Sequence, residues 1–194
     1  MEIGATKAVQ DRLKTTKIEE SKGASLVFCW DTHLTKIKGR NVLFIVNASN
    51  RYTIAMTDIE PRNWNYYAMY ISRVIHGVMQ EMGYSEDQIG QYFKMSGDTI
   101  VTKTHGRKSV GGINRMVMDA QYFGKKLEKE AKYQWELSEY LNRDICQPEG
   151  FDAYGYPSEL FKLDMERLGI ATKRKPAKVI DFAQYIENNR GTND

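Results

Sequence analysis

The stretch Ser25–Thr57, SLVFCWDTHLTKIKGRNVLFIVNASNRYTIAMT, decides the fold that we expect for this chain. Apolar and polar residues alternate in its first and last parts, which is typical of strands with one face in a core. The middle part, VLFIV, is apolar at every position, as in a central strand with both faces covered. Short turns at KGRN and ASNR force neighbouring strands to run antiparallel. The stretch therefore predicts a three-stranded β-meander.

The residues that follow add helices and a fourth strand. Pro61 opens an amphipathic helix that ends at Gly83. Ser85–Gln88, SEDQ, has the pattern of a capping box and starts a second helix. The segment 98–104, DTIVTKT, predicts another strand. We therefore expect an α+β fold, with an antiparallel meander sheet of about four strands covered on one face by helices.

One long helical pattern follows this sheet, and the alternative to a single helix is a break near Gly124, because glycine weakens a helix interior. Apolar residues recur at helical spacing from Val110 to Ile145, and no proline interrupts them before Pro148. The second half of this helix is dominated by charged residues, so we expect it to project from the body, to pack on the C-terminal helix, or to pair with a second copy as a homodimer. Residues 1–124 would form an α+β core domain. Residues 125–194 would form a helical extension with a basic linker, TKRKPAK at 172–178, and a frayed C-terminus.

Composition excludes several classes of protein. The 194 residues are 41% hydrophobic and 27% charged, which is ordinary for a globular domain with its own core. The N-terminus has no apolar segment of the kind found in signal peptides, and the longest apolar run, Val42–Val46, is too short to span a bilayer. Two isolated cysteines predict reduced thiols in a cytoplasmic protein. A net charge of +3 does not by itself argue for a nucleic-acid partner.

The segment Thr102–Met116, TKTHGRKSVGGINRM, combines basic residues, glycines and the start of a helix. Ser109 is expected to cap this helix, whose free amides would form an anion site. The order of residues is not that of a Walker A motif, since Lys108 and Ser109 precede the glycines. The alternative is a solvated turn that only starts the helix. The candidate phosphate or nucleic-acid ligands are Lys103, Arg107, Lys108, Ser109 and Arg115.

Asp31 and His33 lie two residues apart on one strand and could share a proton or a metal ion. Zinc sites normally have at least three protein ligands, and no further cluster at ligand spacing is visible. A metal-dependent hydrolase is therefore the weakest of the functional hypotheses for this sequence. We expect hydrogen-bonded strand residues here, no metal or cofactor, and no catalytic site.

Aromatic residues suggest a surface for a partner protein. Tyrosine and tryptophan combine a large contact area with a polar group, and they are enriched at interfaces. Several lie outside the expected core, in the long helix and in the loop FDAYGYP. The candidate interface residues are Trp135, Phe151, Tyr154 and Tyr156.

Two motifs carry a resemblance to a known family. The first includes Trp30, Leu34, Asn47, Arg51 and Tyr52, and the second includes Thr102, Lys103, Thr104, Arg107, Val110, Gly112 and Asn114. Over residues 25–120 the chain resembles an uncharacterised bacterial family of unknown function. It is similar there to the N-terminal part of plasmid-borne proteins of the pRi open-reading-frame-three type. The resemblance implies a shared α+β fold and an association with mobile elements, and it implies no activity.

These observations favour a non-enzymatic cytoplasmic binding protein, encoded by a phage or mobile element, that engages another macromolecule. Its target would be another protein, for example in a host defence system that it inhibits. The alternative is a nucleic-acid or nucleotide-phosphate binder that uses the basic loop 103–115. The two differ in salt dependence, because binding to phosphates weakens steeply as the salt concentration rises.

Overall fold

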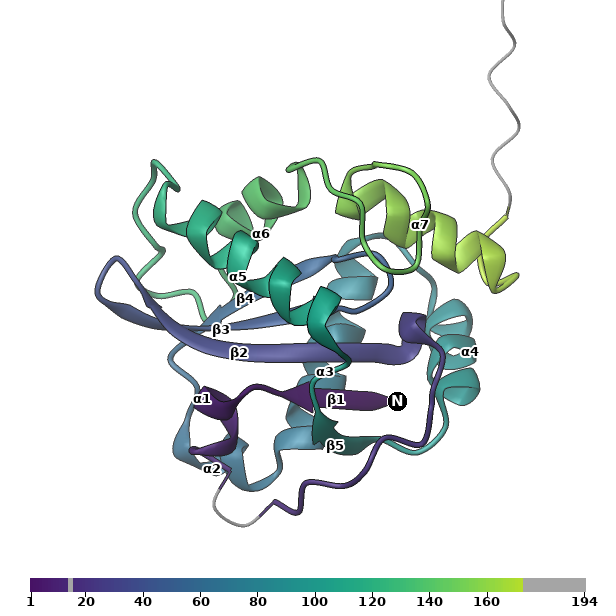
Figure 1. Cartoon of the computed structure of the whole chain (residues 1–194), viewed down its shortest axis with the longest axis horizontal. Helices are drawn as coiled ribbons and strands as arrows, with labels where there is room; N and C mark the ends of the chain where they lie inside the picture. Colours follow the sequence, from purple (N-terminus) through teal and green to yellow (C-terminus); the bar gives the residue numbers. More distant parts are fainter. Residues whose placement is uncertain (14–15, 173–194) are drawn as a thin grey trace, which may run out of the picture.

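A five-stranded mixed sheet forms the centre of the protein in the computed structural model, which describes residues 1–13 and 16–172 (Figure 1). The strand order is β4-β3-β2-β1-β5. The strands are β1 (Glu2–Ala5), β2 (Cys29–Ile37), β3 (Arg40–Asn47), β4 (Thr53–Thr57) and β5 (Ile100–Lys103). Strands β2, β3 and β4 form the predicted antiparallel meander. The expectation of an antiparallel four-stranded sheet is wrong, because β1 pairs in parallel with both β2 and β5.

Strand β1 is buried at every residue and lies between its two partners. Ile3 lies opposite Trp30 on β2 and opposite Val101 on β5. At Gly4 an added Cβ would lie 1.8 Å from Oδ1 of Asp31 on β2. This close approach of a polar side chain to the backbone requires glycine.

Seven α-helices and one short 3-10 helix, η1 (Leu26–Phe28), complete the described part of the chain. The α-helices are α1 (Lys7–Gln10), α2 (Pro61–Asn65), α3 (Tyr67–Glu81), α4 (Glu86–Ser96), α5 (Arg107–Gln121), α6 (Trp135–Asn142) and α7 (Pro157–Arg167). The capping box of α4 is confirmed: Ser85 accepts from the Gln88 amide, and the Gln88 side chain accepts from the Ser85 amide.

Helices cover both faces of the sheet, so the expectation of a single covered face is wrong. In Figure 1, α5 lies in front of the strands and α3 lies behind them. On the α3 side, strand residues such as Ile45 pack with Ile71 of α3 and Phe161 of α7. On the other side, Phe44 packs with residues of α5 and α6 such as Met116. The all-apolar strand β3 thus has both faces buried, as its composition predicted.

The expected long helix is also wrong. Helix α5 ends at Gln121, and no helix forms again before Trp135. Phe123 and Leu127 lie between them and are buried in the core that α5 and α6 share. The helical spacing of Leu127 therefore reflects packing of an irregular segment and not a continuous helix. The homodimer that was expected from this helix stays a prediction.

Helix α6 and the segment before it cover the outer edge of β4. The Asn142 side chain accepts from the amide of Thr53 at 2.8 Å and donates to its carbonyl at 2.8 Å. The Ser138 hydroxyl accepts from the amide of Ala55 at 3.0 Å, and the Gln134 amide donates to the Ala55 carbonyl at 2.9 Å. The backbone of an edge strand that would otherwise be unpaired is thereby satisfied.

The domain division expected at residue 124 stays a prediction. The rest of the basic linker beyond Thr172, and the C-terminal tail, lie outside the described residues. In the part of the chain that the structure describes, no helix has both the length and the apolar composition needed to cross a membrane.

Candidate functional site

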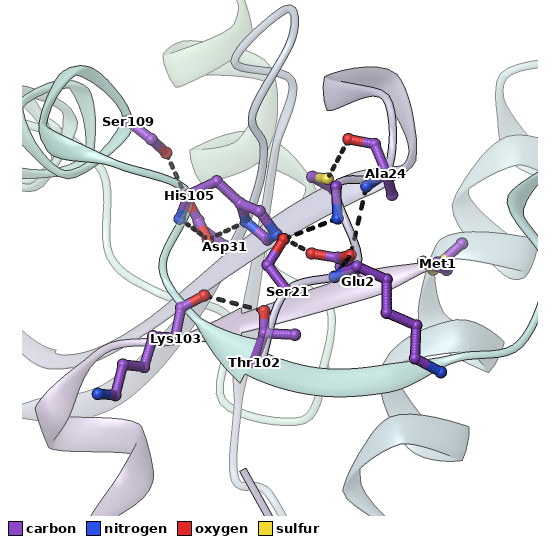
Figure 2. Close-up of polar contacts among 12 residues, drawn as sticks. Met1, Glu2, Ser21, Ala24, Asp31, Thr102, Lys103, His105 and Ser109 are labelled. Carbon is purple, nitrogen blue, oxygen red and sulfur yellow. Dashed lines mark hydrogen bonds and ion pairs between the residues drawn. The ribbon is translucent and has the colours of Figure 1, made fainter. Parts of the chain in front are cut away.

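Four polar side chains from distant parts of the chain meet beside β1 (Figure 2). Nδ1 of His105 lies 2.7 Å from Oδ1 of Asp31, and Nε2 of His105 lies 3.1 Å from Oε2 of Glu2. The Ser109 hydroxyl donates to Oδ2 of Asp31. The His105 side chain is 7% exposed, and those of Glu2 and Asp31 are 3% and 0% exposed. The cluster is therefore an internal one.

The electrostatics of the cluster favour a protonated imidazole. Burial by itself lowers the pKa of His105, but hydrogen bonds to Asp31 and Cys29 outweigh it and raise the pKa to about 10. Burial raises the pKa of Glu2, and hydrogen bonds from Ser21, the Lys22 amide and His105 more than offset it, so that this pKa is lowered. Buried charges persist only when they are paired and hydrogen-bonded, as they are here.

The start of α5 differs from the prediction, and the difference bears on the phosphate hypothesis. The residue before the helix is Gly106, with φ of 97°, and Ser109 is the third helical residue instead of the cap. The His105 amide donates to both oxygens of Asp31, at 3.2 and 3.3 Å, and the Ser109 hydroxyl donates to the same carboxylate. A buried carboxylate of the protein itself thus lies where helix starts favour an anion.

A small basic cavity of about 250 Å³ lies beside the first turns of α5. Three of the predicted phosphate ligands, Lys108, Ser109 and Arg115, line it, together with Gly111, Gly112, Arg51 and one acidic residue, Glu149. The Arg51 guanidinium donates to the carbonyl of Gly112 at 2.7 Å. Lys103 and Arg107 are exposed and do not line this cavity.

Arg51 was not among the predicted phosphate ligands. It lies in the turn after β3, 57 positions before Lys108, and nothing in the local sequence connects the two. Its unusual backbone, with φ of 62°, is a property of the folded turn. Only the first of the two resemblance motifs singled it out.

A larger groove of about 560 Å³ lies between the end of α5 and α6. Its aromatic residues are Phe123, Trp135 and Tyr140, and its charged residues are Asp119, Lys125, Glu136, Glu139, Arg143 and Asp144. Trp135 and Tyr140 are 42% and 43% exposed.

Most charges around this groove are paired. Lys125 contacts Glu136 at 2.6 Å, Arg143 contacts Glu139 at 2.9 Å, and Arg115 contacts Asp119 at 3.2 Å. The Asp144 carboxylate makes no hydrogen bond or ion pair within residues 1–13 and 16–172. The groove therefore has aromatic walls and an excess of negative charge.

The four predicted interface residues fall in different places. Trp135 lines the groove, whereas Tyr154 and Tyr156, 69% and 48% exposed, lie before α7 and do not line it. Phe151 is buried, with the Arg167 guanidinium 3.9 Å from its ring centroid. The structure thus places one of the four at the groove.

Asp31 and His33, which share one strand, have different hydrogen-bond partners. Nδ1 of His33 lies 3.1 Å from the Thr6 hydroxyl, and burial lowers the pKa of His33. Asp31 contacts His105 instead, a residue from another segment. Neither Glu2 nor His105 was predicted to contribute to a site.

Comparison with protein families identifies one match, to the domain of unknown function DUF6933, over residues 2–160. No significant match to a curated protein or to a solved structure was found. The matched residues include the buried cluster, the basic cavity and the groove. The similarity to plasmid pRi proteins, the origin in a phage or mobile element and the inhibition of a host defence system stay predictions. Because the match covers most of its length, the chain belongs to the DUF6933 family.

Proposed function

We propose that this protein is a binding protein that engages a segment of another protein in the groove between α5 and α6. The observation that supports the proposal is a groove of about 560 Å³ in which two large aromatic side chains are more than two-fifths exposed. Aromatic side chains in a concave surface are typical of residues that dominate binding energy at interfaces.

The charges around the groove indicate the chemistry of the bound segment. Four acidic and two basic residues line it, and Asp144 has no ionic partner in the described chain. A lysine or arginine side chain of the partner would pair with Asp144 and lie against the rings of Trp135 and Tyr140. Such a cation–π contact contributes about 0.5–2 kcal/mol, depending on how much water is excluded.

The experiment is an affinity capture from host lysate with nuclease present, using the unmutated chain and the variants Trp135→Ala and Asp144→Asn. We expect a stoichiometric protein partner with the unmutated chain and weaker capture with both variants. Tyr154→Ala is the matched control, since Tyr154 is exposed but lies outside the groove. Capture that both groove variants leave unchanged would refute the proposed surface.

Direct binding then tests the chemistry. Peptides from the captured partner, each with a single lysine or arginine, are compared with matched peptides that carry norleucine at that position. Binding is followed by the fluorescence of Trp135, with Trp135→Phe giving the background of the buried Trp30 and the half-buried Trp64. Equal affinity for the charged and the norleucine peptides contradicts the proposed role of Asp144.

A second candidate function, phosphate or nucleic-acid binding, is favoured by the basic cavity. Arg51, Lys108 and Arg115 surround a space of about 250 Å³ whose wall includes two glycines. A single-stranded oligonucleotide and inorganic pyrophosphate are suitable probes. Binding of either probe should weaken steeply as the salt concentration rises. It should be lost in the double variant Lys108→Ala/Arg115→Ala. The single variant Lys103→Ala should retain it, because Lys103 does not line the cavity.

A further inference from the structure

We propose that Glu2, Cys29 and His105 form a binding site for a divalent metal ion of the zinc type. Each residue offers one ligand atom, and the three atoms lie within 4.8 Å of one another. Carboxylate oxygen, thiolate sulfur and imidazole nitrogen are the ligands that zinc prefers in proteins. The three residues come from β1, the start of β2 and the loop between β5 and α5.

The surroundings of the three side chains orient the ligand atoms toward one point. Asp31 accepts a hydrogen bond from Nδ1 of His105 at 2.7 Å, so Nε2 is the nitrogen that faces Glu2. Oε1 of Glu2 accepts from the amides of Lys22 at 2.7 Å and Ala24 at 3.3 Å, and Oε2 is the oxygen that faces Nε2 of His105. A carboxylate behind a metal-bound histidine is the usual arrangement in zinc sites.

The present spacing requires small movements to admit an ion. Tetrahedral zinc bonds of 2.0–2.3 Å place the ligand atoms roughly 3.3–3.6 Å apart. Nε2 of His105 and Oε2 of Glu2 are 3.1 Å apart, so they would separate by a few tenths of an ångström. The Cys29 thiol donates weakly to the carbonyls of Ser25 and Ala24, at 3.5 and 3.6 Å, and also interacts with His105. Its sulfur lies within 4.8 Å of the other two ligand atoms and would turn toward the ion.

Metal binding balances in charge. The ion replaces the proton on Nε2 of His105 and the proton on the Cys29 sulfur, so two protons leave and one divalent cation enters.

Within residues 1–13 and 16–172 this is the one group of at least three His, Cys, Asp or Glu side chains whose ligand atoms lie this close.

The location of the site suggests a structural ion. Glu2 and Cys29 are 2% and 1% exposed, and the His105 side chain is 7% exposed, so the ion would be enclosed. The three residues would fill three of the four positions of a tetrahedral ion and leave the fourth to a water molecule. The ion would connect three segments that are distant in sequence and would hold β1 against β2. This inference does not depend on the proposed binding function of the groove.

The test uses the purified full chain, freed of metal with a chelator and titrated with Co²⁺. We expect one equivalent of Co²⁺ to produce a thiolate-to-cobalt charge-transfer absorption, which an equivalent of Zn²⁺ then removes. Either ion should raise the Tm, because it binds the folded state. Absence of this absorption in the unmutated chain overturns the proposal without any variant.

Variants identify the ligands. Cys29→Ser should abolish the absorption, and Cys146→Ser, which changes the other buried thiol, should retain it. Asp31 is a positioning residue, so Asp31→Asn should keep the absorption and lower the affinity for Co²⁺ about 10–100-fold. An absorption that survives Cys29→Ser, or that is lost in Cys146→Ser instead, assigns the thiolate elsewhere and refutes the site. Circular dichroism establishes that each variant is folded.

Discussion

Nδ1 of His105 lies 2.7 Å from Oδ1 of Asp31, although 74 residues separate the two in sequence. The contact joins the buried strand β2 to the loop that precedes α5, and Glu2 on β1 lies on the far side of the same imidazole. The buried imidazolium and the two carboxylates stabilise the fold only when all three are present, because a buried charge without its partner is costly.

Removal of the imidazole should therefore be strongly destabilising. His105→Gln takes the cation from between Glu2 and Asp31, and we expect the free energy of unfolding to fall by about 3–5 kcal/mol. Urea denaturation of the metal-free protein measures this. His76→Gln is the control, since His76 is 39% exposed and pairs with exposed Glu86, and its loss should cost less than about 1 kcal/mol. Equal effects of the two substitutions would contradict the assignment.

The stability of the metal-free protein should depend on pH through the same residue. The pKa of His105 is about 10 in the folded state against 6.5 for an ordinary histidine. A raised pKa means that the folded state holds the proton more tightly, so its contribution is complete below pH 6.5 and is lost as the pH rises toward 10. We expect Tm to decline more between pH 7 and 10 for the unmutated chain than for His105→Gln. Parallel declines would show that His105 is not the group responsible.

Gly4 should tolerate no side chain. The Cβ of Gly4→Ala would lie 1.8 Å from Oδ1 of Asp31 and 3.0 Å from Nδ1 of His105, so the cluster must open or β1 must shift. We expect a loss of several kcal/mol or failure to fold, measured by thermal denaturation. Gly77→Ala in α3 meets nothing within 4 Å and should instead stabilise by up to about 1 kcal/mol. A Gly4→Ala variant as stable as the unmutated chain would show that the approach is less tight.

Asn142 should matter more than its position in a short helix suggests. Asn142→Ala leaves the amide and the carbonyl of Thr53 without their buried partners, and each loss costs about 1–3 kcal/mol. Urea denaturation should show a decrease of about 2–6 kcal/mol in the free energy of unfolding. Asn114→Ala, at an exposed position of α5, is the matched control and should change stability little. Hydrogen exchange at the Thr53 amide should quicken in the first variant only.

Local patterns predicted the elements whose signal is local. The meander, the strand at Ile100–Lys103 and the capping box at Ser85 agree with the structure, because alternation, turn residues and caps depend on near neighbours. Strand β1 has four residues, among them a glutamate and a glycine, and so carries no alternation to detect. The spacing of Leu127 matched a helix by coincidence, since Leu127 is buried by tertiary packing of an irregular segment.

The candidate sites were predictable only in part. The segment from Lys103 to Arg115 was identified by its composition, and three of its residues do surround one cavity. The pairing of His105 with Asp31 and with Glu2 depends on the position of β1 between β2 and β5. No feature of sequence spacing specifies that strand order, so the buried cluster could not be predicted.

The position of β1 also has a consequence for how the molecule assembles. The β2–β4 meander needs only nearby residues and can form early, because its loops are short to close. Strand β1 precedes its neighbours in the chain, yet it gains its second partner only when β5, nearly a hundred residues later, is in place. Parallel pairing over such a span slows folding. During synthesis, β1 emerges before β2 and β5 and should nevertheless be among the last strands to be secured.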